Sequence, residues 1–173
     1  MTTTPNTSLG SADCTLHGDL PAGSYQTCSV IYTAGPAGID DTGSIKISMR
    51  FPTDCGTPQF HDPKAPNYTT ARASNGAHLQ LRYDVKDNVR PWGRTLHVKV
   101  LQGYLKANDQ ITVVLGDQSQ GSPGWRIQTF LEKSFELRFH VDRYATYRYE
   151  TLSKSPSFRI VAGPPAKLVA VAP

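Results

Sequence analysis

The stretch SIKISMRF, residues 44–51, decides the fold class of this chain. Its apolar residues Ile45, Ile47, Met49 and Phe51 alternate with polar ones. Successive side chains of a β-strand point to opposite faces of a sheet, so this alternation predicts a strand with one buried and one solvated face. All four apolar residues are expected on the buried face.

The same alternation recurs along the chain. It predicts strands in HLQLRYD (78–84), TLHVKV (95–100), ITVVL (111–115), SFELRFHV (134–141) and PSFRIVAG (156–163). No window has the period of a long amphipathic helix, and glycines and prolines fall between these runs. We therefore predict an all-β fold, an antiparallel β-sandwich of immunoglobulin-like or jelly-roll type with about eight strands and long loops. An eight-stranded barrel is the alternative.

The length of 173 residues suits one domain. Residues 1–20 are rich in Thr, Ser and Asn and predict a flexible N-terminal tail, followed by a single sandwich domain over residues 21–173. Residues 52–70 hold four prolines and no periodicity. A loop this long is either functional or a strap over one end of the sandwich, with Phe60 and Tyr68 covering the edge of the core.

The N-terminus MTTTPNTSLGSAD has neither the basic nor the apolar region of a signal peptide. No apolar stretch approaches the roughly 18 residues that span a bilayer. The expectation is a soluble cytoplasmic protein without a membrane partner. Cys14, Cys28 and Cys55 lack zinc-ligand spacing and are expected to be free thiols, with Cys28 in the core.

The net charge of +4 is unevenly distributed. Residues 1–70 hold three basic and six acidic residues, whereas residues 71–173 hold fifteen basic and eight acidic ones. The basic part would suit an anionic partner. However, most of its charges alternate with apolar residues, which is typical of the solvated face of strands.

The sequence offers no catalytic or metal-binding motif. The five histidines never occur at metal-ligand spacings, and His97 and His140 occupy outward positions of predicted strands. GSPG, residues 121–124, only loosely resembles the G-x-S-x-G nucleophile elbow. We therefore expect no cofactor, no metal and no enzymatic activity.

The stretch GDQSQGSPGWRIQTF, residues 116–130, predicts a long shaped turn that leads into a strand at Trp125. Tryptophan and arginine in such loops either brace the core, anchor a neighbouring domain or bind a ligand. In the bracing interpretation Trp92 and Trp125 cap the core, and Arg90 and Arg126 pair with Asp40, Asp41 or Asp117. The candidates for binding or interface are Asp40, Asp41, Arg90, Trp92, Asp117, Trp125, Arg126 and Gln128.

Two further patterns have simpler explanations. Asp40 and Asp41 in AGIDDTGS could bind Ca²⁺, but a tight turn with a left-handed glycine is the favoured interpretation. VDRYATYRYE, residues 141–150, interleaves arginines with tyrosines that could stack on bases. Because aromatic residues are also common in strands, no nucleic-acid partner is expected.

Several segments, in this order, resemble the N-terminal β-rich region of a family of large bacterial proteins that is known as a domain of unknown function. These segments are AGSYQTCSVIYTAGPAGIDDTGSIKISMRF, DPKAPNY, VRPWGRTLHVKV, ANDQITVVLGD, GSPGWRIQTF, SPSFRIVAGPP and LVAVAP. The family is related to the PHP (polymerase and histidinol phosphatase) metal-dependent hydrolases. The resemblance extends from about residue 23 to residue 173. Cys55, where an aromatic is expected, and Asn108, where the family usually has glycine, depart from it.

The resemblance implies that this β-rich region precedes a metal-binding catalytic domain whose signature begins with a GDLH-type motif. LHGDL, residues 16–20, has the wrong order and position, so the metal ligands are expected to be missing from this chain. The chain is therefore expected to be a non-catalytic accessory domain that docks on or braces a hydrolase catalytic domain, in cis or in trans. The alternative is a free-standing module that binds a carbohydrate or another small polar or anionic ligand.

Overall fold

The computed structural model describes residues 7–164, which form an all-β sandwich preceded by a short 3-10 helix, η1 (Thr7–Leu9). One layer is a four-stranded antiparallel sheet, in the order β1 (Gly10–Cys14), β4 (Cys28–Ala34), β9 (Gln110–Leu115) and β6 (Thr69–Ala73). The facing layer is a five-stranded antiparallel sheet, in the order β13 (Glu150–Thr151), β12 (Arg138–Asp142), β5 (Ser44–Met49), β8 (Arg94–Gln102) and β7 (His78–Asp84).

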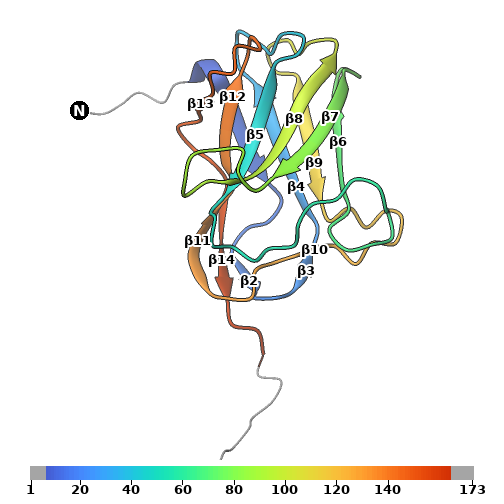
Figure 1. The fold of residues 1–173 in the computed structure, drawn as a ribbon, viewed down its shortest axis with the longest axis vertical. Helices are drawn as coiled ribbons and strands as arrows, with labels where there is room; N and C mark the ends of the chain where they lie inside the picture. The colour runs from blue at the N-terminus through green and yellow to red at the C-terminus, as the bar shows by residue number, and fades with distance from the viewer. Residues whose placement is uncertain (1–6, 165–173) are drawn as a thin grey trace, which may run out of the picture.

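Two small sheets extend the sandwich at its lower end in Figure 1. One has the order β11 (Glu132–Glu136), β14 (Ser157–Val161) and β2 (Asp19–Pro21), and the other pairs β10 (Trp125–Arg126) with β3 (Tyr25–Gln26). The pairing of β14 with β2 is parallel, and the others are antiparallel. The predicted all-β sandwich is confirmed, and the described chain forms open sheets rather than the alternative barrel.

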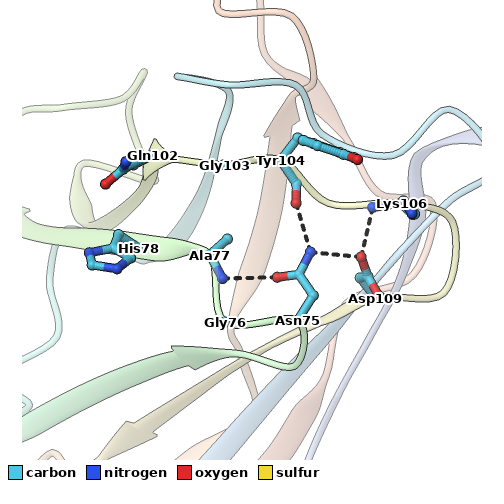
Figure 2. Close-up of a pocket in the computed structure, with 9 residues that line it drawn as sticks. All are labelled: Asn75, Gly76, Ala77, His78, Gln102, Gly103, Tyr104, Lys106 and Asp109. Carbon is cyan, nitrogen blue, oxygen red and sulfur yellow. Dashed lines mark hydrogen bonds between the residues drawn. The ribbon is translucent and has the colours of Figure 1, made fainter.

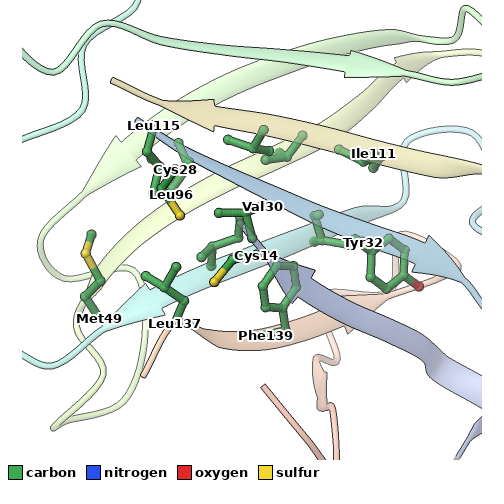
Figure 3. Close-up of a cluster of buried hydrophobic side chains, with 14 of the residues drawn as sticks. Cys14, Cys28, Val30, Tyr32, Met49, Leu96, Ile111, Leu115, Leu137 and Phe139 are labelled. Atoms are coloured by element: carbon green, nitrogen blue, oxygen red, sulfur yellow. The ribbon is translucent and has the colours of Figure 1, made fainter. Parts of the chain in front are cut away.

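The core lies between the two large sheets, where the alternating residues of facing strands meet (Figure 3). Tyr32 on β4 stacks on Phe139 on β12 across the two layers, with ring centroids 6.3 Å apart. Cys14, Cys28 and Cys55 are buried free thiols, as predicted. The predicted inward residues Ile45, Ile47 and Met49 are all buried.

Two predictions about strand boundaries are wrong. Phe51 lies beyond the end of β5 and is 45% exposed, because the chain turns after Met49. The run SFELRFHV is not one strand, since it contributes to β11 and β12 in different sheets. At Leu137, between them, the chain passes from one sheet to the next.

The prediction of a flexible tail over residues 1–20 is corrected for the part of it that the structure describes. Residues 10–14 form β1, which pairs with β4 along its whole length, and residues 19–21 form β2. Leu9 and Leu20 are buried. Paired backbone groups and buried leucines hold this polar stretch in the fold despite its composition.

The long loop of residues 52–68 runs across the lower end of the sandwich (Figure 1). Phe60 packs against the core, as expected for a strap, whereas Cys55 is itself buried in the core. At the upper end, Asn108 adopts a φ of 69°. Asparagine tolerates this left-handed conformation better than most residues other than glycine.

Candidate functional site

Trp125 is an internal brace of the lower end. Its side chain is fully buried, and its ring lies against Phe135 with centroids 6.3 Å apart. The indole Nε1 donates a hydrogen bond of 3.0 Å to the carbonyl oxygen of Gly56 in the long loop. Because no part of the ring reaches the surface, Trp125 ties residues 52–68 to β10 and cannot stack on a ligand.

Arg126 and Gln128 continue this brace. The Arg126 guanidinium donates a hydrogen bond of 2.6 Å to the backbone carbonyl of Asp54 and lies 3.8 Å from its carboxylate. Gln128 is fully buried, accepts a hydrogen bond of 2.7 Å from the Thr53 hydroxyl and donates one of 3.0 Å to Glu132. Both side chains therefore brace this end of the fold, and the ion-pair partner of Arg126 is Asp54 rather than the predicted Asp40, Asp41 or Asp117.

Two hydrogen bonds from Thr129 fix the Asp54 carboxylate. Thr129 donates hydrogen bonds of 2.8 Å from its backbone N and 2.7 Å from its hydroxyl. Burial acts to raise the pKa of Asp54, but these hydrogen bonds and the Arg126 charge together lower it below the ordinary value. The carboxylate therefore stays ionised and is already engaged within the fold.

Trp92 and Arg90 lie together but make different contacts. Trp92 is 8% exposed, and the Arg138 guanidinium covers its ring at 4.0 Å from the centroid, with that of Arg50 at 5.5 Å. Arg90 lies over the ring of Phe51 at 4.8 Å. Arg90 thus contacts an aromatic ring rather than the predicted aspartates, and Trp92 is covered by Arg138 from β12 and by Arg50, which follows β5.

The three predicted aspartates lie at opposite ends of the sandwich. Asp40 and Asp41 form a tight turn at the upper end, where Asp40 Oδ1 accepts a hydrogen bond of 2.8 Å from Asp41 N. The left-handed residue of this turn is Thr42, with a φ of 64°, and not the predicted glycine. Asp117 lies at the lower end, where its carboxylate accepts hydrogen bonds from Thr70 at 2.8 Å and from Ser119 N at 2.9 Å. The length of β4, about 20 Å for seven residues, separates the two ends, so the eight candidates do not form one site.

A pocket of about 540 Å³ opens at the upper end, between the turn of residues 74–77 and the loop of residues 103–109 (Figure 2). Asn75 holds it together, because its Nδ2 donates to the Tyr104 carbonyl at 2.7 Å and to the Asp109 carboxylate at 2.9 Å. The Tyr104 side chain is 53% exposed, and Lys106 Nζ lies 5.9 Å from its ring centroid. This pocket is polar, preformed and edged by one aromatic ring.

A polar cluster on the outer face of the five-stranded sheet escaped the sequence analysis. His140, Lys46 and His97 are direct neighbours on β12, β5 and β8. Lys46 Nζ donates a hydrogen bond of 2.9 Å to the backbone carbonyl of Asp87, lies 3.4 Å from its carboxylate and sits 4.1 Å above the ring of Tyr149. The alternation of β5 and β8 could have located this row, but nothing local indicates that loops cover it.

In this row, His97 is half-buried and His140 is buried, whereas the sequence predicted that both would be exposed. His140 Nε2 accepts a hydrogen bond of 2.9 Å from the Asn88 amide, and its Nδ1 lies 2.9 Å from the Thr151 hydroxyl. Burial lowers the pKa of His97 and of His140 to about 4, and nearby cations add to this effect. Both rings are therefore neutral at pH 7.

Residues 7–164 contain no group of three or more His, Cys, Asp or Glu side chains arranged to hold a metal ion. Over the same residues, no helix is long and apolar enough to cross a membrane.

Comparison with known proteins gives little more. No family model matches the sequence, and no curated protein matches it. Among solved structures, the chain is similar to the seventh ScaB type I cohesin from Pseudobacteroides cellulosolvens, with 8% identity and a TM-score of 0.36, over 92% of this chain and 98% of that chain. The fold assignment therefore rests on the strand pairing described above.

Proposed function

We propose that this chain is a non-catalytic accessory β-sandwich domain that docks on, and braces, the catalytic domain of a metal-dependent hydrolase of the family that its loops resemble. The catalytic domain would be supplied in cis or in trans. The supporting observation is an apolar hollow at the lower end of the molecule, which a second domain would cover.

The hollow lies along β11 and β14 and has a volume of about 350 Å³. Leu131 forms one wall and is 62% exposed, and its neighbour Phe130 is 43% exposed. Ile160 and Ala162 also line the hollow, and Lys133 contributes a charged side chain to its lining. Exposed apolar side chains beside charged residues are typical of protein–protein contact surfaces.

The position of this hollow suits a domain tethered in cis. β14 runs toward the lower end in Figure 1, and Gly163 lies beside Pro21 there. A domain that followed residue 173 in the same polypeptide would be tethered near the hollow, which raises its effective concentration at this surface.

The brace described above makes this surface rigid. Gln128 links the Thr53 hydroxyl to the Glu132 carboxylate at the start of β11. Trp125 and Arg126 fix the long loop beside it. A surface ordered before binding loses little conformational entropy when a partner docks, which favours affinity. In this proposal, Trp125, Arg126 and Gln128 do not contact the partner, but they order the surface on which it docks.

The test is binding between this chain and a separately produced catalytic domain of the resembled family, measured by calorimetry at tens of micromolar. Leu131→Asp is expected to weaken binding at least about tenfold, because a charge would have to be desolvated in the interface. Leu101→Asp is the matched control, since Leu101 is 53% exposed but lies on β8. Absence of binding, or equal weakening by both variants, would refute the proposal.

The pocket around Tyr104 supports a second candidate, a free-standing module that binds a carbohydrate or another small polar ligand. Its volume of about 540 Å³ and its half-exposed aromatic ring suit a sugar, which stacks on aromatic faces and hydrogen-bonds to fixed polar groups. Titrating neutral sugars while recording amide NMR spectra tests this candidate. Tyr104→Ala should abolish saturable shifts, whereas Tyr25→Ala, which removes a tyrosine 45% exposed on β3, should not.

A further inference from the structure

The loop of residues 143–149, at the upper end, holds an exposed tyrosine in an unfavourable backbone conformation. Ala145 and Tyr147 have φ values of 55° and 60°. A bulky residue rarely adopts a positive φ, and such strain persists only where the surroundings impose it. Tyr147 is nevertheless 81% exposed, so burial of its ring is not what stabilises this conformation.

Asp142 imposes the conformation. Its carboxylate is buried and accepts hydrogen bonds from Tyr147 N at 2.7 Å, from Thr146 N and hydroxyl at 3.1 Å each, and from Tyr144 N at 3.4 Å. A carboxylate with four donors has its charge largely compensated. Asp142 therefore shapes the loop, and its charge also reaches Tyr149, whose pKa is raised by burial and, to a smaller extent, by this carboxylate.

This loop closes one side of a pocket of about 180 Å³ above the outer face of the five-stranded sheet. The floor is formed by Ser44 on β5 and by His97 and Lys99 on β8, and Thr42 and Tyr147 also line the pocket. The volume is sufficient for a group of a few heavy atoms, and Tyr147 presents its ring beside it.

One cation and one carboxylate line the pocket, those of Lys99 and Asp142. The hydrogen bonds described above engage the Asp142 carboxylate, whereas Lys99 makes no ion pair within residues 7–164. The nearby Lys46 and Arg82 lie 3.4 and 3.0 Å from the Asp87 carboxylate, and Arg82 also lies 3.4 Å from that of Asp84. Besides burial, His97 experiences the charges of all three cations and of Asp87. Lys99 is thus the charge in this pocket that no described residue neutralises by an ion pair, which favours an anion over a cationic ligand.

The hydrogen-bonding groups beside Lys99 suit an oxyanion. The Ser44 hydroxyl lies 2.8 Å from the Tyr149 hydroxyl, which lies 3.1 Å from His97 Nε2. This Ser–Tyr–His chain can turn its hydroxyl hydrogens toward an acceptor, because each oxygen can act as donor or acceptor.

We infer that the pocket between β5, β8 and the loop of residues 143–149 is a binding site for the oxyanion group of a small ligand, with Lys99 supplying the charge and Tyr147 flanking the rest of the ligand. The site is separate from the apolar hollow at the lower end and from the Tyr104 pocket. Its success or failure is therefore independent of the two candidate functions above.

Inorganic phosphate is the first probe, with the His97 ring followed by NMR at pH 7 and across a pH titration. Phosphate is expected to shift the ring signals saturably and to raise the pKa of His97, because a bound anion stabilises the imidazolium. Lys99→Ala, and Lys99→Gln as a second variant, are expected to weaken binding at least about tenfold. Lys154→Ala is the matched control, since Lys154 is exposed and lies outside the pocket.

A second arm separates a free inorganic ion from an oxyanion carried by a sugar. Glucuronate is titrated against glucose, which lacks the carboxylate, on the chain and on Tyr147→Ala. Tighter binding of glucuronate than of phosphate, lost in Tyr147→Ala, would support a ligand with a ring; equal or tighter binding of phosphate would support a small inorganic ion. Shifts that grow linearly with concentration, or that Lys99→Ala and Lys154→Ala reduce equally, would overturn the inference.

Discussion

Replacing Trp125 with phenylalanine measures how strongly the long loop is tied to the sandwich. Phenylalanine keeps a ring against Phe135 but loses the Nε1 donor, so the Gly56 carbonyl loses a hydrogen bond of 3.0 Å. An unsatisfied buried polar group costs about 1–3 kcal/mol. The loss of two buried ring carbons adds roughly 1.6 kcal/mol, from ~0.8 kcal/mol for each. We therefore expect the free energy of unfolding to fall by about 2.6–4.6 kcal/mol, a large part of the stability of an ordinary domain.

The assay is urea unfolding followed by circular dichroism, which does not depend on the fluorescence of the residue that is replaced. Trp92→Phe is the matched control, because Trp92 is stacked between arginines and makes no Nε1 hydrogen bond within residues 7–164. Its loss should be nearer 1 kcal/mol, from a weaker cation–π contact and less buried area. A fall of less than about 1 kcal/mol for Trp125→Phe, or equal falls for both variants, would refute the bracing role.

Three other predictions follow from burial and backbone geometry. The pKa values of His97 and His140 are lowered to about 4 in the folded chain, whereas the ordinary pKa of histidine is 6.5, so below pH 6.5 the unfolded chain binds more protons than the folded one. Stability should therefore be complete above pH 6.5 and should fall as the pH drops toward 4. His140→Gln should reduce this fall, as measured by urea midpoints at each pH. Gly116→Ala should prevent stable folding, because its φ is 69° and the added methyl would collide with the backbone of β10. Gly76→Ala is the control, since Gly76 has a similar φ of 81° but open space around it, and it should lower the stability measured by thermal unfolding by only about 1 kcal/mol. Burial raises the pKa of Cys55 to about 11, so a thiol reagent at pH 8 should label it only after denaturation; rapid labelling of the folded chain would contradict its buried position.

Much of the fold could be predicted because alternation is a local property. HLQLRYD matches β7 residue for residue, and ITVVL lies within β9. The incorrect predictions concern segments whose structure depends on pairing with residues far away in the sequence. Residues 10–14 look like a polar tail, but β4 offers them a complete set of backbone partners. Leu137 belongs to an unbroken alternation, yet the chain changes sheets there.

The candidate site could be predicted only in part. The sequence left open whether Trp125 braces the core, anchors a neighbouring domain or binds a ligand, and its complete burial favours the bracing role. It could not identify Asp54 as the partner of Arg126, since 72 residues separate them and several aspartates had suitable charge. It also placed His97 on an open strand face, because the loops that cover this face lie far away in the sequence.

The sequence by itself determined the fold class and the buried face of most strands, because a strand repeats every two residues whatever it pairs with. It also indicated which loops carry tryptophan and arginine. The tertiary structure alone decided which ends of the sandwich these loops occupy, that Trp125 faces inward, and that Lys99 meets Ser44 beneath the loop that displays Tyr147. These contacts depend on strand order and on loop paths, which join residues that no local pattern connects.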